Sequence, residues 1–331
     1  MSIVPSHDGI TLGLVTRNRP RFVENLLSTI FTANSRYLVD IIVYDSSEND
    51  QTWSVVRRFP SVLYLRGKKR LPGGRNEILR RVRSGLVCYL DDDIRLHPRH
   101  FDILWEDFKG RDDVAVVGGP AILVSSDGKP LRKIHAGFGF NRFDKSVHTI
   151  QKADHSQCWI PDSISEVDFV IGANMCFKVR LLRKVGGFDE AYERGTCFHE
   201  DTDPQLSLRR QGYVVLYDPR LRVDHYAAQG GTRSDVSKRT IIMNRYQNTR
   251  NQVYLMRKHH LLTVRAMYEL WREMGALYIK KSMLLAGQTP NSSPSRSTAV
   301  IVDAASAIFL FLAGQLSEFA FPTSPRGLEK T

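Results

Sequence analysis

Three aspartates, Asp91, Asp92 and Asp93, follow directly on the apolar run GLVCYL of residues 85–90. Adjacent carboxylates repel one another, so either water surrounds them or a positive charge lies among them. A divalent hard cation such as Mn²⁺ or Mg²⁺ takes oxygen ligands and would offset this repulsion. Residues two apart in an extended backbone point the same way, so Asp91 and Asp93 could share one site while Asp92 points elsewhere. A solvated turn without an ion is the alternative interpretation.

A second acidic group lies in the run HEDTD of residues 199–203. Asp203 precedes Pro204, and this pair predicts the N-cap and first turn of a helix that Gly212 would close. Glu200 and Asp201 have no such local explanation, which makes them candidates for acid–base chemistry. The alternative is that both acids are structural.

The elements that would position these acids alternate between two types over the first 120 residues. Short β-branched runs predict strands, and apolar residues at three- and four-residue spacing predict helices. The predicted strands are 10–16, 40–45, 61–66, 85–90 and 114–119, and the predicted helices are 21–33, 51–59, 74–84 and 99–108. This alternation indicates an α/β fold with a mostly parallel, doubly wound sheet flanked by helices. Ligands of such sheets bind outside the carboxyl ends of the strands, where Thr16, Asp45, Arg66 and the aspartate triplet stand.

The second half of the chain is less regular. Residues 120–165 show no clear period and predict irregular strands and loops. Further on, the sequence predicts strand structure over 166–178, helices over 180–186 and 203–212, and two short strands within 213–226. Basic amphipathic helices are expected over 231–285, and a Pro- and Ser-rich linker with an apolar helix over 286–331.

Composition restricts the partners and the compartment. Lys and Arg number 47 against 35 Asp and Glu, a formal charge of +12 that favours anionic partners such as phosphorylated small molecules, nucleic acid or an acidic membrane surface. The four cysteines form no CxxC pair, which is typical of buried thiols in a reducing compartment. The start MSIVPSHDGI lacks a signal segment, so we expect a cytoplasmic protein, with peripheral contact on the inner face of an anionic membrane as an open alternative.

Four stretches, in this order, resemble the family 2 glycosyltransferases, which are enzymes of the GT-A fold. They are LVTRNRPRFVENLLSTI (14–30), DIIVYDSSEND (40–50), LPGGRNEILRRVRSGLVCYLDDDIRLHP (71–98) and VGGFDEAYERGTCFHEDTDPQLSLRRQGY (185–213). The resemblance covers about residues 10–226. It implies a GT-A type, Rossmann-like catalytic domain over 1–230 with a C-terminal helical extension. The nucleotide-sugar half would be 1–120 and the acceptor half 121–230.

The resemblance also implies roles for the donor side of the site. Thr16, Arg17 and Asp45 would hold the nucleotide base. Asp91 and Asp93, with His225 as a further ligand, would bind Mn²⁺ or Mg²⁺ across the diphosphate of the donor.

Three further residues complete this expected site. Asp92 is counted among the donor-binding residues. Arg75 follows Gly73 and Gly74 at a helix start, where close approach and the helix dipole favour a phosphate. The resemblance places the general base at Asp201, beside Glu200 of the same motif.

The function implied is a metal-dependent, inverting transfer of one sugar from a nucleoside-diphosphate sugar to an acceptor hydroxyl. The QxxRW motif of processive relatives is absent, because no tryptophan follows an arginine, so we expect one sugar per encounter. The basic C-terminal region suggests a lipid-linked or cell-envelope glycan as acceptor. The alternatives are a nucleotidyltransferase of related fold and a non-enzymatic, basic nucleic-acid-binding protein; no nucleic acid is expected as a partner of the leading candidate.

Overall fold

The structure, a computed structural model, describes residues 7–68, 70–125, 129–134, 163–194, 196–226 and 238–260. These residues belong to two compact units, one holding all the strands and the other holding the last helix. The strands are β1 (His7–Thr16), β2 (Leu38–Asp45), β3 (Val62–Arg66), β4 (Ser84–Leu90), β5 (Ile94–Leu96), β6 (Val114–Gly118), β7 (Ala121–Val124), β8 (Pro130–Ile134), β9 (Ser165–Val167), β10 (Asn174–Lys178), β11 (Val214–Tyr217) and β12 (Val223–His225). The α-helices are α1 (Pro20–Ala33), α2 (Gln51–Val56), α3 (Leu71–Arg81), α4 (His100–Phe108), α5 (Val179–Lys184), α6 (Thr202–Arg210) and α7 (Lys238–Lys258).

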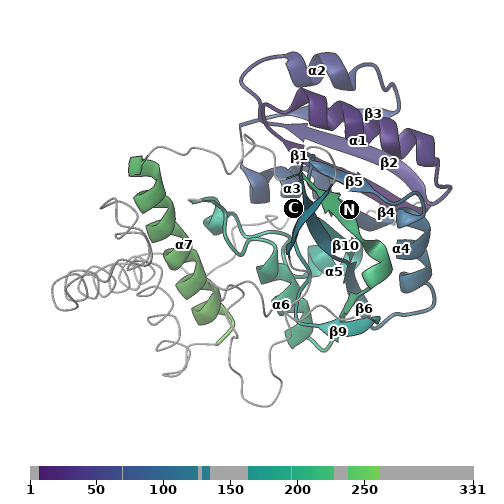
Figure 1. Ribbon diagram of the computed structural model, residues 1–331. Helices are drawn as coiled ribbons and strands as arrows, with labels where there is room; N and C mark the ends of the chain where they lie inside the picture. Colours follow the sequence, from purple (N-terminus) through teal and green to yellow (C-terminus); the bar gives the residue numbers. More distant parts are fainter. Residues whose placement is uncertain are drawn as a thin grey trace. The chain divides into compact units, whose positions relative to one another are not determined.

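An eight-stranded sheet in the order β3-β2-β1-β4-β10-β6-β11-β9 forms the centre of the first unit (Figure 1). Strands β3, β2, β1 and β4 are parallel, as is the pair β6 and β11. Strand β10 runs antiparallel to both of its neighbours, and β9 runs antiparallel to β11. The predicted mostly parallel, doubly wound sheet is confirmed, with β10 as a reversed strand in its middle.

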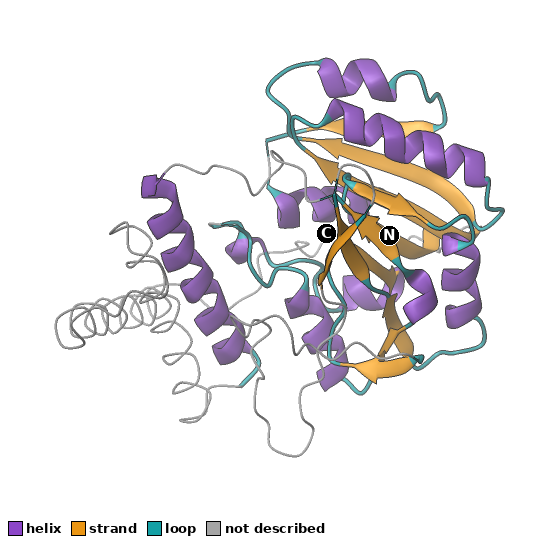
Figure 2. Ribbon diagram, in the orientation of Figure 1, coloured by secondary structure: helices purple, strands orange, loops and turns teal. Residues whose placement is uncertain are grey.

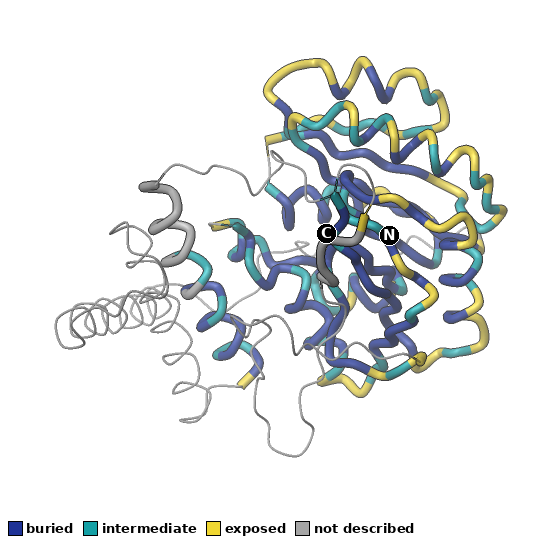
Figure 3. The backbone as a smooth tube through the Cα atoms, in the orientation of Figure 1, coloured by how far each residue is buried: buried dark blue, intermediate teal, exposed yellow. Residues whose placement is uncertain are grey.

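Helices lie against the two faces of this sheet (Figure 2), and each face has its own apolar cluster. Alternate residues of β1, β2 and β4 pack with α1, α2 and α4 in one cluster. The intervening residues pack with α3, α5 and α6 in a second cluster. Because side chains alternate across a strand, a run buried on both faces reads as continuously apolar, as the predicted strands do. The central strands are accordingly buried, whereas the outer sides of α1 and α2 are exposed (Figure 3).

Helix α1 shows how the sequence sets such an element. Pro20 stands in its first turn, where the missing N–H costs nothing, and Asn34 ends it in the left-handed conformation with φ 45°. Its buried residues, Val23, Leu26, Leu27 and Ile30, recur at the spacing of one helix face.

A second, four-stranded sheet in the order β5-β12-β7-β8 adjoins the carboxyl end of β4 in sequence. It contains the irregular strands predicted after residue 120, and residues 135–162 lie outside the described part. The regular structure predicted over 166–178 consists of two strands, β9 and β10, with a turn at Gly172 and Ala173 just before β10.

Helix α7 is the described part of the predicted C-terminal helices. Its neighbours over 261–331, including the predicted linker and apolar helix, lie outside the described residues. Within the described ranges, no helix is both long and apolar enough to cross a bilayer.

Candidate metal and acid–base site

Asp91, Asp93 and His225 form a cluster with the composition of a metal site. One ligand atom from each residue lies within 4.8 Å of the others. His225 Nε2 is 3.6 Å from Asp91 Oδ2 and 3.4 Å from Asp93 Oδ1. Two carboxylates and one imidazole suit Mn²⁺, and the oxygen ligands also suit Mg²⁺. This combination brings together the three residues that the sequence predicted as ligands.

Strand pairing explains how a histidine so far along the chain reaches the aspartates. In the small sheet, β12 pairs with β5, and His225 stands opposite Ile94, the residue after Asp93. The Tyr226 N–H donates to the Asp93 carbonyl at 2.9 Å, which extends the ladder past the cluster. The order of the strands therefore fixes His225 beside the end of β4.

The protonation of His225 responds to its acidic neighbours. Burial lowers the pKa of this imidazole, but the hydrogen bond to Asp91 and the charges of Asp91 and Asp93 outweigh it and raise the pKa overall. The ring's Nδ1 is buried without a hydrogen-bond partner among the described residues. A cation beside Nε2 would reverse this balance, because a metal binds the neutral imidazole.

Asp92 points away from the cluster, as the alternation of the backbone predicted. It is 4 % exposed and accepts hydrogen bonds from Thr16 Oγ1 at 2.6 Å and from Arg19 Nη1 at 2.8 Å. Burial raises the pKa of Asp92 to about 6, although the Arg19 charge opposes this. Asp92 and Thr16, both expected to hold the donor, therefore bind each other inside the protein.

Arg19 is a site residue that sequence reasoning missed. Its Nη1 also lies 3.2 Å from Asp93 Oδ2, so one guanidinium neutralises two members of the triplet. Arg19 therefore offsets part of the repulsion among the three adjacent aspartates. The signal was present in the run TRNRPRF, where Arg19 immediately precedes the Pro20 that starts α1.

In the second acidic group, the helix-capping residue is not the aspartate that the sequence predicted. Helix α6 begins at Thr202 with Asp201 as its N-cap, two residues before the cap expected at Asp203. Asp203 is 2 % exposed and accepts from Tyr192 Oη at 3.4 Å. The prediction of Asp203 as the cap was wrong, because Thr202 already has a helical backbone and its N–H needs the Asp201 carboxylate.

Asp201 keeps partial exposure while both of its oxygens are fixed by the main chain. Oδ1 accepts from the Thr202 N–H at 2.9 Å, and Oδ2 accepts from the Gly172 N–H at 2.7 Å. His199 supports the same turn, because its Nδ1 lies 3.3 Å from Thr202 Oγ1. Burial lowers the pKa of His199 to about 4, so its ring is neutral there.

Glu200 and Arg75 lie deeper than the sequence suggested. Glu200 is fully buried and forms an ion pair of 2.5 Å with Arg75, which is itself 2 % exposed. The start of α3, expected to face a phosphate, is occupied by Glu193, whose Oε1 accepts from the Gly73 N–H at 3.1 Å. The structure therefore gives Arg75 an internal partner in place of the expected donor phosphate.

The predicted base-binding residues also divide into an inner and an outer group. Asp45 is fully buried and accepts from the Ser47 N–H and from Tyr64 Oη, both at 2.8 Å. Asp45 therefore closes its own turn, a common role of an aspartate at a strand end. Arg17 remains accessible, with 35 % of its side chain exposed and an ion pair to Glu48 at 2.6 Å.

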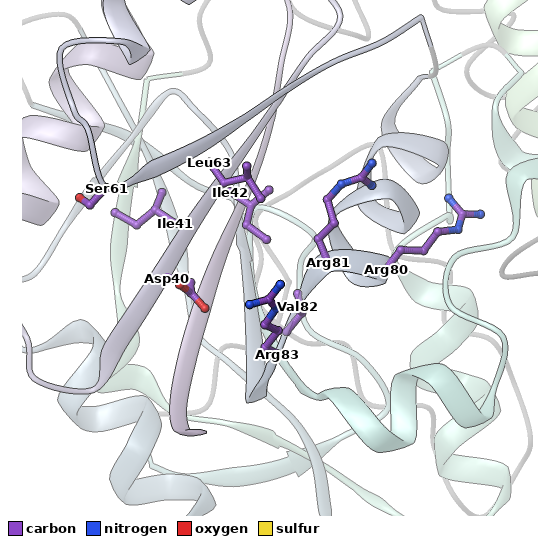
Figure 4. A pocket seen from close by; sticks show the side chains of 9 residues that line it. All are labelled: Asp40, Ile41, Ile42, Ser61, Leu63, Arg80, Arg81, Val82 and Arg83. Carbon is purple, nitrogen blue, oxygen red and sulfur yellow. The ribbon is translucent and has the colours of Figure 1, made fainter. Parts of the chain in front are cut away.

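A groove of about 490 Å³ is shown in Figure 4. It lies at the starts of the parallel strands β2 and β3, whereas the acids described above follow strand ends or begin α6. Arg80, Arg81 and Arg83 line it beside the starts of β2 and β3. None of the predicted site residues contributes to it. The groove is therefore separate from the candidate metal and acid–base site.

Comparison with known proteins places this geometry in a family context. The family model described as glycosyl transferase family 2 matches residues 11–179, just over half of the 331-residue chain. Chondroitin synthase of Escherichia coli is 24 % identical over 226 residues, which covers 62 % of this chain and 33 % of that protein. The chain thus spans about a third of the length of this curated relative.

Solved structures extend the comparison beyond detectable sequence similarity. GalNAc-T7 with UDP, GalNAc and Mn²⁺ has a TM-score of 0.57 and 13 % identity, covering 91 % of this chain and 55 % of its own. The mannosyltransferase PcManGT of Pyrobaculum calidifontis with GDP-Man and Mn²⁺ has a TM-score of 0.49 and 16 % identity, covering 96 % and 89 %. The likeness to the first structure supports the GT-A fold that the sequence predicted.

Proposed function

Because the chain belongs to glycosyl transferase family 2, we propose that it transfers one sugar from a nucleoside-diphosphate sugar to an acceptor hydroxyl, with Mn²⁺ or Mg²⁺ as cofactor. The observation that supports this best is the cluster of Asp91, Asp93 and His225 at the carboxyl end of β4. Ligand sites of open α/β sheets lie at such strand ends. The alternatives of a nucleotidyltransferase and a nucleic-acid-binding protein have no comparable support.

The cluster fits a divalent cation on its own chemistry. Asp91 is accessible enough to reach an ion, Asp93 is held by Arg19 on its other side, and His225 offers Nε2 to both. When bound, the cation supplies positive charge that stabilises the departing nucleoside diphosphate. The residues themselves fix where that charge lies, because β4, β5 and β12 hold all three side chains.

Asp201 is the proposed general base. Its carboxylate would accept the proton of the acceptor hydroxyl as that oxygen bonds to the anomeric carbon and the bond from this carbon to the diphosphate oxygen breaks. The diphosphate leaves with the electron pair of the broken bond. A single displacement from the opposite face inverts the anomeric configuration. The two main-chain hydrogen bonds to Asp201 support this role, since they orient the carboxylate and leave lone pairs for the proton.

The donor is proposed to lie along the carboxyl ends of β1, β2 and β4. Arg17 follows β1 and is an accessible cation on this edge, so we assign it a direct contact with the nucleotide. Thr16, Asp45 and Asp92 would contribute indirectly. Their hydrogen bonds within the protein fix the loops that would contact the nucleotide.

The acceptor is proposed to be a lipid-linked or cell-envelope glycan, extended by one sugar per encounter. This proposal comes from the basic C-terminal region and from the absence of the QxxRW motif. Peripheral contact with an anionic membrane belongs to the same proposal. Most of the residues that suggest it, 261–331, lie outside the described part of the chain.

The test is a panel of nucleotide sugars screened by thermal shift, with and without Mn²⁺, followed by product analysis. We expect one nucleotide sugar to raise the melting temperature only when the metal is present. Transfer to the acceptor should then give a product of inverted configuration by NMR. A lack of metal-dependent donor binding across the panel would contradict the function, and a retained configuration would contradict the role of Asp201 in a single displacement.

A further inference from the structure

The position of the Asp201 carboxylate depends on an unusually close main-chain contact. A Cβ atom added at Gly172 would lie 2.5 Å from Asp201 Oδ2, well inside van der Waals contact. The Gly172 N–H reaches the same oxygen at 2.7 Å because nothing but hydrogen stands on its Cα. The hydrogen bond and the close contact at Gly172 therefore fix the orientation of the Asp201 carboxylate.

A buried arginine, Arg75, binds the main chain of this turn. Arg75 Nη2 donates to the Gly172 carbonyl at 2.9 Å, while Arg75 Nη1 pairs with Glu200 at 2.5 Å. The rings of Tyr89 and Phe188 lie 5.7 and 5.3 Å from the guanidinium carbon. A planar guanidinium with separate donors can hold two acceptors in a fixed mutual geometry.

The two acceptors belong to the two segments that meet at the proposed base. Glu200 immediately precedes Asp201, and the Gly172 N–H bonds the Asp201 side chain. A single guanidinium thus joins the segment carrying Asp201 to the turn that orients it. On its other side this turn reaches the metal cluster, because the Asp91 N–H donates to the Ala173 carbonyl at 3.3 Å.

From this continuous set of contacts we propose that Arg75 is a positioning residue that orients the Asp201 carboxylate through the main chain of Gly172, with Glu200 as its charge partner. The proposal rests on the proposed role of Asp201 as general base. It assigns Arg75 and Glu200 no contact with donor or acceptor, because both side chains are buried. Their loss should therefore slow the chemical step and leave donor binding unchanged.

The kinetic test uses the full chain and separates kcat from donor binding. Removing Arg75 alone would take away the charge partner of the buried Glu200, which destabilises a fold, so the two residues are changed together. We expect Arg75→Gln with Glu200→Gln, and separately Gly172→Ala, to lower kcat about 10- to 100-fold, the range expected for a misplaced reacting group. The Kd of the donor, measured by calorimetry with Mn²⁺, should stay within about twofold of the original protein.

Three comparisons keep this result specific. Gly85→Ala is the matched control, since a Cβ there meets nothing within 4 Å, and it should keep full activity. Arg75→Lys should recover part of kcat, because an ammonium can reach one of the two acceptors. In an Asp201→Asn background, Gly172→Ala should cost nothing further. A parallel rise in donor Kd, or additive losses in that background, would overturn the proposal.

A readout without turnover distinguishes this inference from the proposed function. Hydrogen exchange of the Gly172 amide should quicken in Arg75→Lys, whereas exchange at Cys88 in β4 should not change. Unchanged exchange at Gly172 would overturn the positioning role even in an active enzyme. Faster exchange in a protein that transfers no sugar would support the contact and refute the function.

Discussion

The main-chain N–H of Asp91 donates to the carbonyl of Ala173 at 3.3 Å, across the ladder of β4 and β10. Asp91 belongs to the candidate metal cluster, and Ala173 follows the glycine that orients Asp201. Because β10 is antiparallel to β4, its start lies beside the end of β4. The metal cluster at the end of β4 therefore lies next to the turn before β10 that binds the Asp201 side chain, although Asp91 and Asp201 are more than a hundred residues apart in sequence.

Removal of one metal ligand tests the cluster directly. We expect Asp93→Asn to weaken Mn²⁺ binding at least about 10-fold by calorimetry, because it replaces a charged ligand with a neutral one. The matched control is Asp224→Asn, on the same strand as His225, whose carboxylate pairs with Arg95 and Arg222 outside the cluster. Unchanged Mn²⁺ affinity in Asp93→Asn would refute the metal assignment.

Substitutions of Asp201 and Asp203, at the start of α6, should have different effects on kcat. Asp201→Asn should lower kcat by about 10²- to 10⁴-fold, the usual contribution of a general base, with donor binding intact. Asp203→Asn should instead lower the melting temperature while kcat per folded molecule stays the same, since Asp203 is buried against Tyr192. If Asp201→Asn turned over normally, another group would have to take the proton.

Arg17 should affect the donor and leave the chemical step unchanged. We expect Arg17→Ala to raise the donor KM by about 10-fold or more, the value of a charge-assisted hydrogen bond, with kcat within about twofold. Arg36→Ala is the control, because Arg36 is an exposed arginine beside Tyr37, at the opposite end of the strands. Equal KM values for the two variants would remove Arg17 from the donor site.

Stability should depend on pH through Asp107, which lies beside Asp218 and Arg220 on the side of α4. Burial, together with the charge of Asp218, raises the pKa of Asp107 to about 7. The unfolded value is about 4, so the folded state binds this proton more tightly. Its contribution to stability is present below about pH 4 and is lost as the pH rises to about 7.

The variant Asp107→Asn mimics the protonated side chain and should flatten this part of the stability curve. Urea denaturation between pH 4 and pH 8 measures it, and the variant should be the more stable protein at pH 8. Glu106→Gln, on the same helix but half-exposed, should leave the slope unchanged. If the stability of Asp107→Asn depended on pH as steeply as that of the original protein, other groups would have to cause the dependence.

The parts of the site that follow strand ends were predictable from the sequence. The run GLVCYLDDD announces a buried strand that ends in acids, and alternation along the backbone separated Asp92 from Asp91 and Asp93 correctly. Helix α1 was equally legible, because Pro20 and Asn34 mark its two ends. These features depend on neighbouring residues alone.

The parts that failed depend on contacts between distant segments. Nothing near Arg75 shows that Glu200 neutralises it, and nothing near Gly172 shows that Asp201 approaches its Cα. The cap of α6 was misplaced by a local rule, since Pro204 is tolerated anywhere in the first turn.

The reversed strand β10 has a consequence for the chain during its synthesis. Strand β4 is complete at residue 90, but β10, its neighbour on the side away from β1, is complete only at residue 178. At roughly 5–20 residues per second, the apolar strand SGLVCYL is without this neighbour for on the order of 4 to 18 seconds during synthesis. An uncovered apolar edge invites pairing with other chains, so overproduction of this protein should benefit from slower translation and chaperone supply. The pairing of β4 with β10 brings the metal cluster next to the Gly172 turn. The same pairing makes the solubility of the growing chain depend on residues that are made later.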